Sequence, residues 1–269
     1  MSKDVEIFAK KIRRSILKTA HEAGSSSAHI GGALSSVEIV STLFSKIMNY
    51  NKKNYNSPER DRFILSKGHA CLVYYCALAE LGIIPYEQLK TFEKSESDLL
   101  GHPVKNKKIG IEFSNGSLGM GLSLSVGVSI ACRKKNLKNK IYVLLGDGEC
   151  NEGSVWEAAM SAVHFKLNNL IVIIDRNNFQ QTGKSDEIMI YNDLKKMWDS
   201  FGFFTKEVDG HNINQLLEVL EKNNSLEKPT AIIANTIKGK GISFTENDNN
   251  WHHAVLTKKM YEKAKQELE

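Results

Sequence analysis

Residues 141–149 read IYVLLGDGE, a short apolar run followed at once by two glycines that flank an aspartate. Five consecutive apolar residues of this kind predict a strand that is buried on both faces. Two more such runs occur at Leu170–Ile174 and Ala231–Ala234. Short apolar strands separated by helices are what a parallel sheet covered on both faces requires. We therefore predict an α/β fold with a doubly wound, mostly parallel sheet and helices on both faces.

Periodicity and turn residues place most of the other elements. We expect a strand at 62–66, and helices over about 5–22, 35–48, 70–81, 118–132 and 152–166. Ser35 or Ser36 is the expected cap of the second helix, and Gly82 is expected to end the third. The small-residue stretch 24–32 is expected to be a turn, and the helix over 118–132 is expected to be buried. The helix over 152–166 would be the right-handed crossover between the first two apolar runs.

The bulk composition excludes several classes of protein. The chain has 269 residues, of which 41% are hydrophobic and 25% charged, and its formal charge of +5 is mild. We expect one domain over residues 1–269, with no nucleic-acid partner and no membrane segment. The four cysteines match neither a zinc site nor a redox pair, and no secretory signal is expected at the N-terminus. These features favour a cytoplasmic protein with reduced thiols.

The loop after residues 141–145 has the composition of a phosphate and metal site. Ligands of open α/β sheets bind beyond the carboxyl ends of the strands, and Gly146 and Gly148 would let the backbone approach a phosphate closely. Asp147 cannot bind a phosphate directly, because both are anions. It can do so through a divalent cation, which carboxylate, amide and carbonyl oxygens coordinate. The sequence therefore indicates a bound magnesium or calcium ion.

A second loop supplies the complementary ligand. The run Leu170–Ile174 is followed by Asp-Arg-Asn-Asn-Phe, and the amide oxygen of Asn177 can bind the same cation. The carboxyl ends of the two strands should be neighbours, so the two loops would form one metal–diphosphate cage. A lone Gly-Asp-Gly is usually only a tight turn, and an Asn pair is usually a polar loop. The presence of both motifs at the ends of two neighbouring strands indicates a metal–diphosphate site.

This pair of loops resembles the thiamine diphosphate signature, and residues from about 10 to 257 resemble the N-terminal section of transketolase. The resemblance implies that Asp147, Asn177 and the carbonyl of Phe179 bind Mg²⁺, with Ca²⁺ or Mn²⁺ able to substitute. It implies that Gly146 and Gly148 lie against the diphosphate. By the same resemblance, Gly116-Ser117-Leu118-Gly119 contacts the aminopyrimidine ring of the cofactor, and Glu152 lies at a subunit interface, where it supports the activating carboxylate.

Four histidines also fall on motifs of that family. His69 lies in Ser-Lys-Gly-His-Ala and would contact the diphosphate. His29, His102 and His252 would line the substrate channel, where imidazoles hydrogen-bond sugar hydroxyls and transfer protons. His252 is also expected to contact the cofactor. We expect structural or surface roles for the remaining histidines, which are His21, His164, His211 and His253.

The chain departs from the transketolase pattern in composition and in length. Ala28, Ile30 and Ser117 replace a glycine and two prolines of the family, which affects the shape of the cleft and hence sugar preference. The pyrimidine-binding and C-terminal domains are absent from these residues. The resemblance therefore implies a separate C-terminal subunit that carries the activating glutamate, in an α2β2 assembly. The implied reaction is transfer of a two-carbon ketol unit from a ketose or its phosphate to an aldose or its phosphate.

Other functions share this fold and cofactor. One is the α subunit of a 2-oxo-acid dehydrogenase, against which the four histidines argue, because they suit polyhydroxylated sugars. Another is a fragment of a deoxyxylulose-phosphate synthase, or a transketolase-like enzyme of a specialised sugar pathway. A third is a non-catalytic cofactor-binding subunit, which would have no need of metal ligands.

Overall fold

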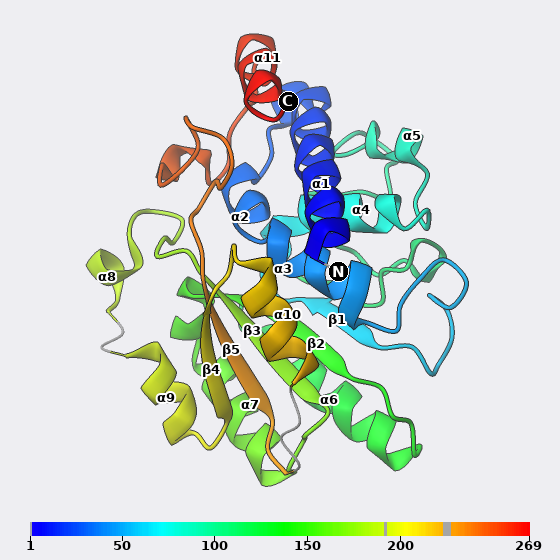
Figure 1. Cartoon of the computed structure of the whole chain (residues 1–269), viewed down its shortest axis with the longest axis vertical. Coiled ribbons are helices and arrows are strands. Elements are labelled where there is room, and N and C mark those ends of the chain that lie inside the picture. Colours follow the sequence, from blue (N-terminus) through cyan, green and yellow to red (C-terminus); the bar gives the residue numbers. More distant parts are fainter. Residues whose placement is uncertain (1, 191–192, 223–226) are drawn as a thin grey trace.

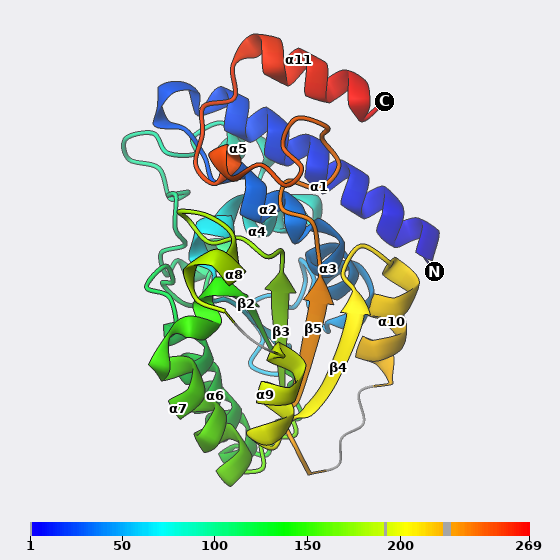
Figure 2. The same cartoon turned by 90° about the vertical axis from the view of Figure 1, so that its left-hand side faces the viewer.

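One parallel sheet of five strands organises the computed structural model, which describes residues 2–190, 193–222 and 227–269. The strands are β1 (Arg62–Leu65), β2 (Ile141–Gly146), β3 (Leu170–Arg176), β4 (Phe204–Asp209) and β5 (Thr230–Asn235). Their order is β1-β2-β3-β5-β4, and each neighbouring pair is parallel. The arrows of β3, β4 and β5 point the same way in Figure 2. The predicted α/β sheet is therefore confirmed.

Helices cover both faces of the sheet (Figures 1 and 2). One face packs against α1 (Ser2–Glu22), α2 (Ile30–Ser35), α3 (Val37–Thr42), α4 (Cys71–Glu80) and α10 (Ile213–Glu221). The other packs against α6 (Met120–Lys134), α7 (Gly153–His164) and α9 (Leu194–Ser200). The remaining α-helices are α5 (Tyr86–Leu89), α8 (Ser185–Ile188) and α11 (Lys258–Glu267). Shorter helical turns are η1 (Gly24–Ser26), η2 (Leu43–Ile47), η3 (Gly68–Ala70), η4 (Lys107–Ile109), η5 (Gly148–Asn151) and η6 (Asn249–Trp251).

The apolar runs of the sequence become strands because both of their faces are buried. In β2, Tyr142 and Leu144 point into the core under α1 to α4, whereas Val143 and Leu145 point into the core under α6 and α7. Successive side chains of a strand alternate between faces, so a strand between two helical layers must be apolar throughout. In the described residues, no helix is both long and apolar enough to cross a membrane.

Three local expectations were wrong. The expected turn at 24–32 already contains the start of α2 at Ile30, and the helix expected over 35–48 divides at Ser36 and ends in the π-helical turn η2. Ser36 is the N-cap residue of α3, as expected, but its side chain makes no capping hydrogen bond. The Ser36 hydroxyl instead donates to the carbonyl of Gly32 at 2.9 Å. The helix α6 is not fully buried, because Met120 is 48% exposed and Leu124 is 36% exposed.

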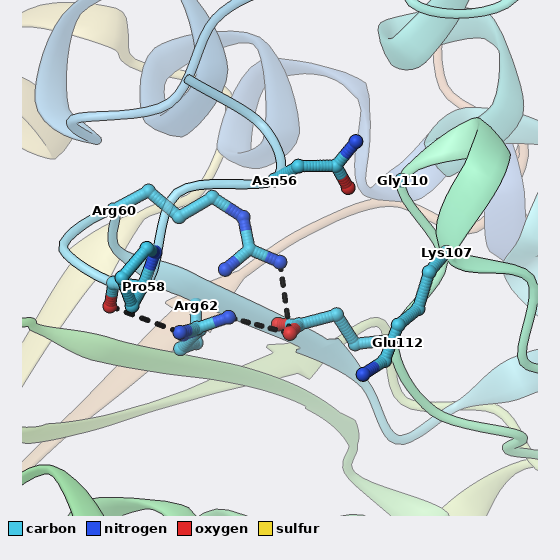
Figure 3. Close-up of a pocket in the computed structure, with 7 residues that line it drawn as sticks. All are labelled: Asn56, Pro58, Arg60, Arg62, Lys107, Gly110 and Glu112. Carbon is cyan, nitrogen blue, oxygen red and sulfur yellow. Dashed lines mark hydrogen bonds and ion pairs between the residues drawn. The ribbon is translucent and has the colours of Figure 1, made fainter.

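An ion-pair cluster fastens the loop before α6 to the start of β1 (Figure 3). One oxygen of Glu112 accepts from Arg60 Nη2 at 2.8 Å and from Arg62 Nη1 at 2.5 Å. The cluster borders a cavity of about 250 Å³, together with Asn56 and Lys107. Because Glu112 belongs to the segment between His102 and Gly116, the cluster anchors a loop that returns to the carboxyl ends of the strands.

Replacing Glu112 with glutamine is expected to destabilise the fold. The side chain of Glu112 is only 18% exposed, and a neutral amide cannot balance two guanidinium groups. Breaking such a pair leaves charge poorly compensated, so we expect a loss of roughly 2–3 kcal/mol in the free energy of unfolding. Urea denaturation would measure it. Glu218→Gln, in an exposed pair with Lys222, is the control and should leave the midpoint nearly unchanged. Equal midpoints for both variants would contradict this role of Glu112.

Candidate active site

The loops that follow β2 and β3 meet at the carboxyl edge of the sheet. The two strands pair in register up to Gly146 and Asp175, so their ends are adjacent. Asp147, only 2% exposed, accepts the backbone N–H of Asn178 at 2.8 Å and the hydroxyl of Ser185 at 3.0 Å. The earlier loop is therefore bonded directly to the later one.

Asn177 lies on the same cavity as Asp147. Its side-chain oxygen accepts the N–H of Phe179 at 3.1 Å, and its nitrogen donates to Asp175 at 3.2 Å. The cavity of about 500 Å³ is lined by both residues and by Phe179. The structure thus brings together the three residues predicted from the two loops.

The glycines of the first loop leave room for a ligand. A methyl group built on Gly146 would touch nothing within 4 Å, whereas one on Gly148 would lie 2.7 Å from the side chain of Gln180. Gly116 has a φ of +143°, and a methyl group there would lie 2.8 Å from the ring of His102. Gly116 and Leu118 line the cavity together with Gly146 and Gly148. Ser117 is exposed and is absent from that lining.

Two glutamates of the first loop have different surroundings. Glu149 is 2% exposed, accepts the backbone N–H of Gly119 at 2.8 Å and that of Gly146 at 3.1 Å, and bonds Ser66. It therefore holds the 116–119 loop against the first loop. Glu152 also lines the cavity but is exposed. This position leaves the carboxylate accessible to another chain.

Five histidines form a cluster at one wall of the cavity. His29 lies at its centre, with ring centroids 5.6 Å from His69, 5.5 Å from His102, 5.4 Å from His252 and 4.4 Å from His253. Burial lowers the pKa of His29 to about 3 and that of His252 to about 4, and the neighbouring charged groups act in the same direction. Burial also holds the pKa of His69 and His102 below the ordinary value. These four rings are therefore neutral near pH 7.

The other histidines divide as follows. His21 stacks on Tyr261, His164 is exposed, and His211 bonds Glu38 at 2.9 Å, as expected for structural or surface residues. His253 is exposed, as expected for a surface residue, and its ring also lies against that of His29.

Three charged residues of the site were not predicted from the sequence. Lys67, 1% exposed, forms a buried ion pair with Asp175 and donates to the carbonyl of Gly32 at 3.0 Å. Although burial opposes it, the Lys67 ammonium lowers the pKa of Asp175. Lys238 donates to Asn249 at 2.5 Å and contacts His252 Nδ1 at 3.1 Å. Lys67 follows Ser66 in the motif that contains His69, so its place in that motif was the one available signal.

The residues present suit an anion held through a hard cation. Burial raises the pKa of Asp147 to about 6, and the Asp175 carboxylate acts in the same direction, so the buried carboxylate would gain from a bound cation. The donors predicted for the cation are all oxygens, as Mg²⁺ requires. The described residues contain no group of three His, Cys, Asp or Glu side chains that could hold a metal. A site of one carboxylate, one amide and one carbonyl does not depend on such a group.

Comparisons with known proteins agree with this geometry. The sequence model of the family described as "Transketolase, thiamine diphosphate binding domain" matches residues 6–269. One of the subunits of the apulose-4-phosphate transketolase from Actinobacillus succinogenes is 45% identical over 267 residues, which cover 98% of this chain and 96% of that protein. The 6-deoxy-6-sulfo-D-fructose transketolase subunit SqwG of Clostridium sp. strain MSTE9 is 38% identical, over 99% of this chain and 96% of that protein.

Solved structures give the same result for the fold. Transketolase from Leishmania mexicana superposes with a TM-score of 0.89 at 26% identity, covering 98% of this chain and 41% of that one. Transketolase from Campylobacter jejuni gives 0.86 at 30% identity, covering 98% and 42%. The chain thus spans about two fifths of these transketolases but nearly the whole of the relatives named as subunits. It belongs to the transketolase family, as the domain that binds thiamine diphosphate.

Proposed function

We propose that this chain is the diphosphate-binding subunit of a two-chain transketolase, which moves a two-carbon ketol unit from a ketose or its phosphate to an aldose or its phosphate. One observation carries the proposal: Asp147, Asn177 and four histidines line a single cavity. A metal–diphosphate cage next to neutral imidazoles suits a sugar-handling enzyme. Membership of the transketolase family argues in the same direction, and against a 2-oxo-acid dehydrogenase subunit.

Asp147, the Asn177 amide and the carbonyl of Phe179 would hold Mg²⁺, which Ca²⁺ or Mn²⁺ could replace. Gly146 and Gly148 would lie against the diphosphate, with His69 at hydrogen-bond reach and the 116–118 loop at the aminopyrimidine. Lys238 adds positive charge near the anion, and burial lowers its pKa only to about 8, so it stays protonated at pH 7. These residues bind and orient the cofactor and do not react themselves.

When bound, thiamine diphosphate supplies the carbon nucleophile and the electron sink for cleaving the bond beside a ketose carbonyl. The histidines provide hydrogen bonds and proton transfer to the sugar. Because Lys238 Nζ donates to Nδ1 of His252, the Nε2 of that imidazole carries the proton and can donate it. His29 and His102, also neutral, would hold the hydroxyl groups of the donor and acceptor sugars.

A second chain would complete the enzyme. Relatives that match over nearly their whole length are named as transketolase subunits, which supports a partner chain with the pyrimidine-binding domain. The exposed Glu152 is placed to meet the activating carboxylate of that chain. We propose an α2β2 assembly, a single domain over residues 1–269 of this chain, and a cytoplasmic location, which the buried thiols Cys71, Cys76, Cys132 and Cys150 suit.

Reconstitution tests this function. The chain would be mixed with the product of the adjoining reading frame, thiamine diphosphate and Mg²⁺, and assayed for ketol transfer. D-Xylulose 5-phosphate, apulose 4-phosphate and 6-deoxy-6-sulfo-D-fructose would serve as donors, with several aldose phosphates as acceptors. Transfer from at least one donor is the expected result. A complex that binds the cofactor but transfers nothing from any donor would favour the non-catalytic alternative.

A further inference from the structure

A small β-bridge lies next to His29, one of the residues that line the cavity. Ala28 donates to the carbonyl of Ala254 at 3.0 Å, and Ala254 donates back to Ala28 at 3.0 Å. This antiparallel pair sets His29 and His253 opposite each other as the next pair in register. The 4.4 Å separation of their ring centroids follows from that register.

Ser27 orients the ring of His253. The Ser27 hydroxyl donates to the carbonyl of Ser26 at 2.6 Å, so its oxygen serves as an acceptor for the imidazole. His253 Nε2 is 2.9 Å from that oxygen and Nδ1 is 3.4 Å away, so the hydroxyl lies beside the ring edge between the two nitrogens and holds the ring in place. An imidazole nitrogen can donate to or accept from a hydroxyl group, depending on the tautomer. The ring held beside Ser27 is therefore able to hydrogen-bond a sugar hydroxyl.

The backbone at Ser27 has an unusual conformation. Its φ is +58°, a left-handed conformation that serine adopts rarely and glycine adopts freely. Strained positions of this kind concentrate at ligand sites, where other interactions hold them. A serine at this position adopts an unfavourable backbone conformation, and its hydroxyl contacts the ring of His253. His253 also interacts electrostatically with His29, His102 and His252, so it belongs to the same cluster.

We propose that His253, held by Ser27, is a further substrate-binding residue that hydrogen-bonds a hydroxyl of the sugar beside His29 and so helps to determine which ketose is used. The inference rests on the proposed transketolase function. It adds a fifth imidazole, one ring outward from His29, to the four that line the cavity. Its position at the rim, away from Asp147 and Asn177, separates sugar recognition from cofactor binding.

The test uses the reconstituted two-chain enzyme and steady-state kinetics with D-xylulose 5-phosphate, apulose 4-phosphate and 6-deoxy-6-sulfo-D-fructose. His253→Leu should raise KM about tenfold for the preferred donor, with kcat within about twofold, because a substrate hydrogen bond common to ground state and transition state is lost. His253→Gln, which retains an acceptor, should recover most of the affinity. Ser27→Gly, which fits the left-handed backbone, should raise KM about threefold by freeing the ring.

Two controls separate this inference from the function on which it rests. Calorimetric affinity for thiamine diphosphate with Mg²⁺ should be unchanged in all three variants, and His164→Leu, an exposed histidine at the far end of α7, should match the wild type in KM. Unchanged KM for every donor in His253→Leu, with cofactor bound and turnover intact, would overturn the role of His253. Failure of the wild-type complex to bind cofactor or transfer ketol units would instead overturn the proposed function, and the inference with it.

Discussion

Asp147→Ala is expected to abolish Mg²⁺-dependent binding of thiamine diphosphate. The carboxylate is the one charged oxygen donor among the three groups predicted to hold the cation, and without it the diphosphate loses its bridge to the protein. Loss of an indirect partner of a metal ligand typically costs 10- to 100-fold in affinity, so loss of the ligand itself should exceed about a hundredfold. Titration calorimetry of the chain with cofactor and Mg²⁺ would measure this, and chelation by EDTA should mimic it in the wild type.

Asp147 also accepts two hydrogen bonds, so a structural effect must be separated from a ligand effect. Asp147→Asn keeps the shape and an acceptor oxygen but removes the charge, and it should lose Mg²⁺-dependent binding nearly as fully as alanine. Ser185→Ala removes one of the hydrogen bonds to Asp147 and leaves the carboxylate in place. It should retain cofactor binding within about tenfold. If Ser185→Ala loses cofactor binding as completely as Asp147→Asn, the Asp147 carboxylate only holds the two loops together and does not bind the cation.

The second large effect concerns the partner: the purified chain alone should show no ketol transfer, and adding the pyrimidine-domain subunit should restore it. The described residues that line the cavity include the predicted metal donors, four histidines and Lys67, but the transketolase resemblance places the activating glutamate on another domain. The exposed Glu152 would then lack that glutamate as its partner in the isolated chain. A coupled assay across a range of partner concentrations should give a rate that saturates at a fixed ratio of the two chains.

Glu152→Gln offers a matched variant for that experiment. It should leave cofactor binding by the single chain unchanged, while it lowers the turnover of the complex by about tenfold or more, since a positioned acid–base partner contributes on that scale. Trace activity from a contaminating host transketolase is controlled by Asp147→Ala protein purified in the same way. Ketol transfer that scales with the concentration of the single wild-type chain, and is absent in the Asp147→Ala preparation, would contradict the requirement for a partner.

The central strands and the two loops could be predicted together, because ligand-binding loops follow the carboxyl ends of buried apolar strands. Strands such as β2 and β3, covered on two faces, must be apolar throughout, and ligand-binding loops follow their carboxyl ends. The edge strand β4 was missed for the opposite reason. Of its six residues only Thr205 is buried, so no apolar run marks it. The start of α2 was missed because Gly31 and Gly32 look like turn residues and form a helix only through packing.

The site was predictable where residue type and motif coincided, and not where position alone matters. Asp147 and Asn177 were indicated by residue type and spacing at two strand ends, and the histidines by the resemblance of their motifs to those of transketolase. The roles of Lys238 and Asp175 depend on contacts with residues that are distant in the sequence. No local sequence pattern indicates such contacts. His253 shows the same limit, because its neighbour His29 comes from a segment far away in the sequence.

The bridge between Ala28 and Ala254 bears on how the protein matures. Because it joins positions 28 and 254, His29 and His253 face each other only once residue 254 has left the ribosome. The sheet strands up to β3 can pair much earlier, since they need only the first 176 residues. A nascent chain would therefore acquire much of its scaffold, and the loops after β2 and β3, well before this histidine pair, so that the sugar-binding wall is completed late in biogenesis.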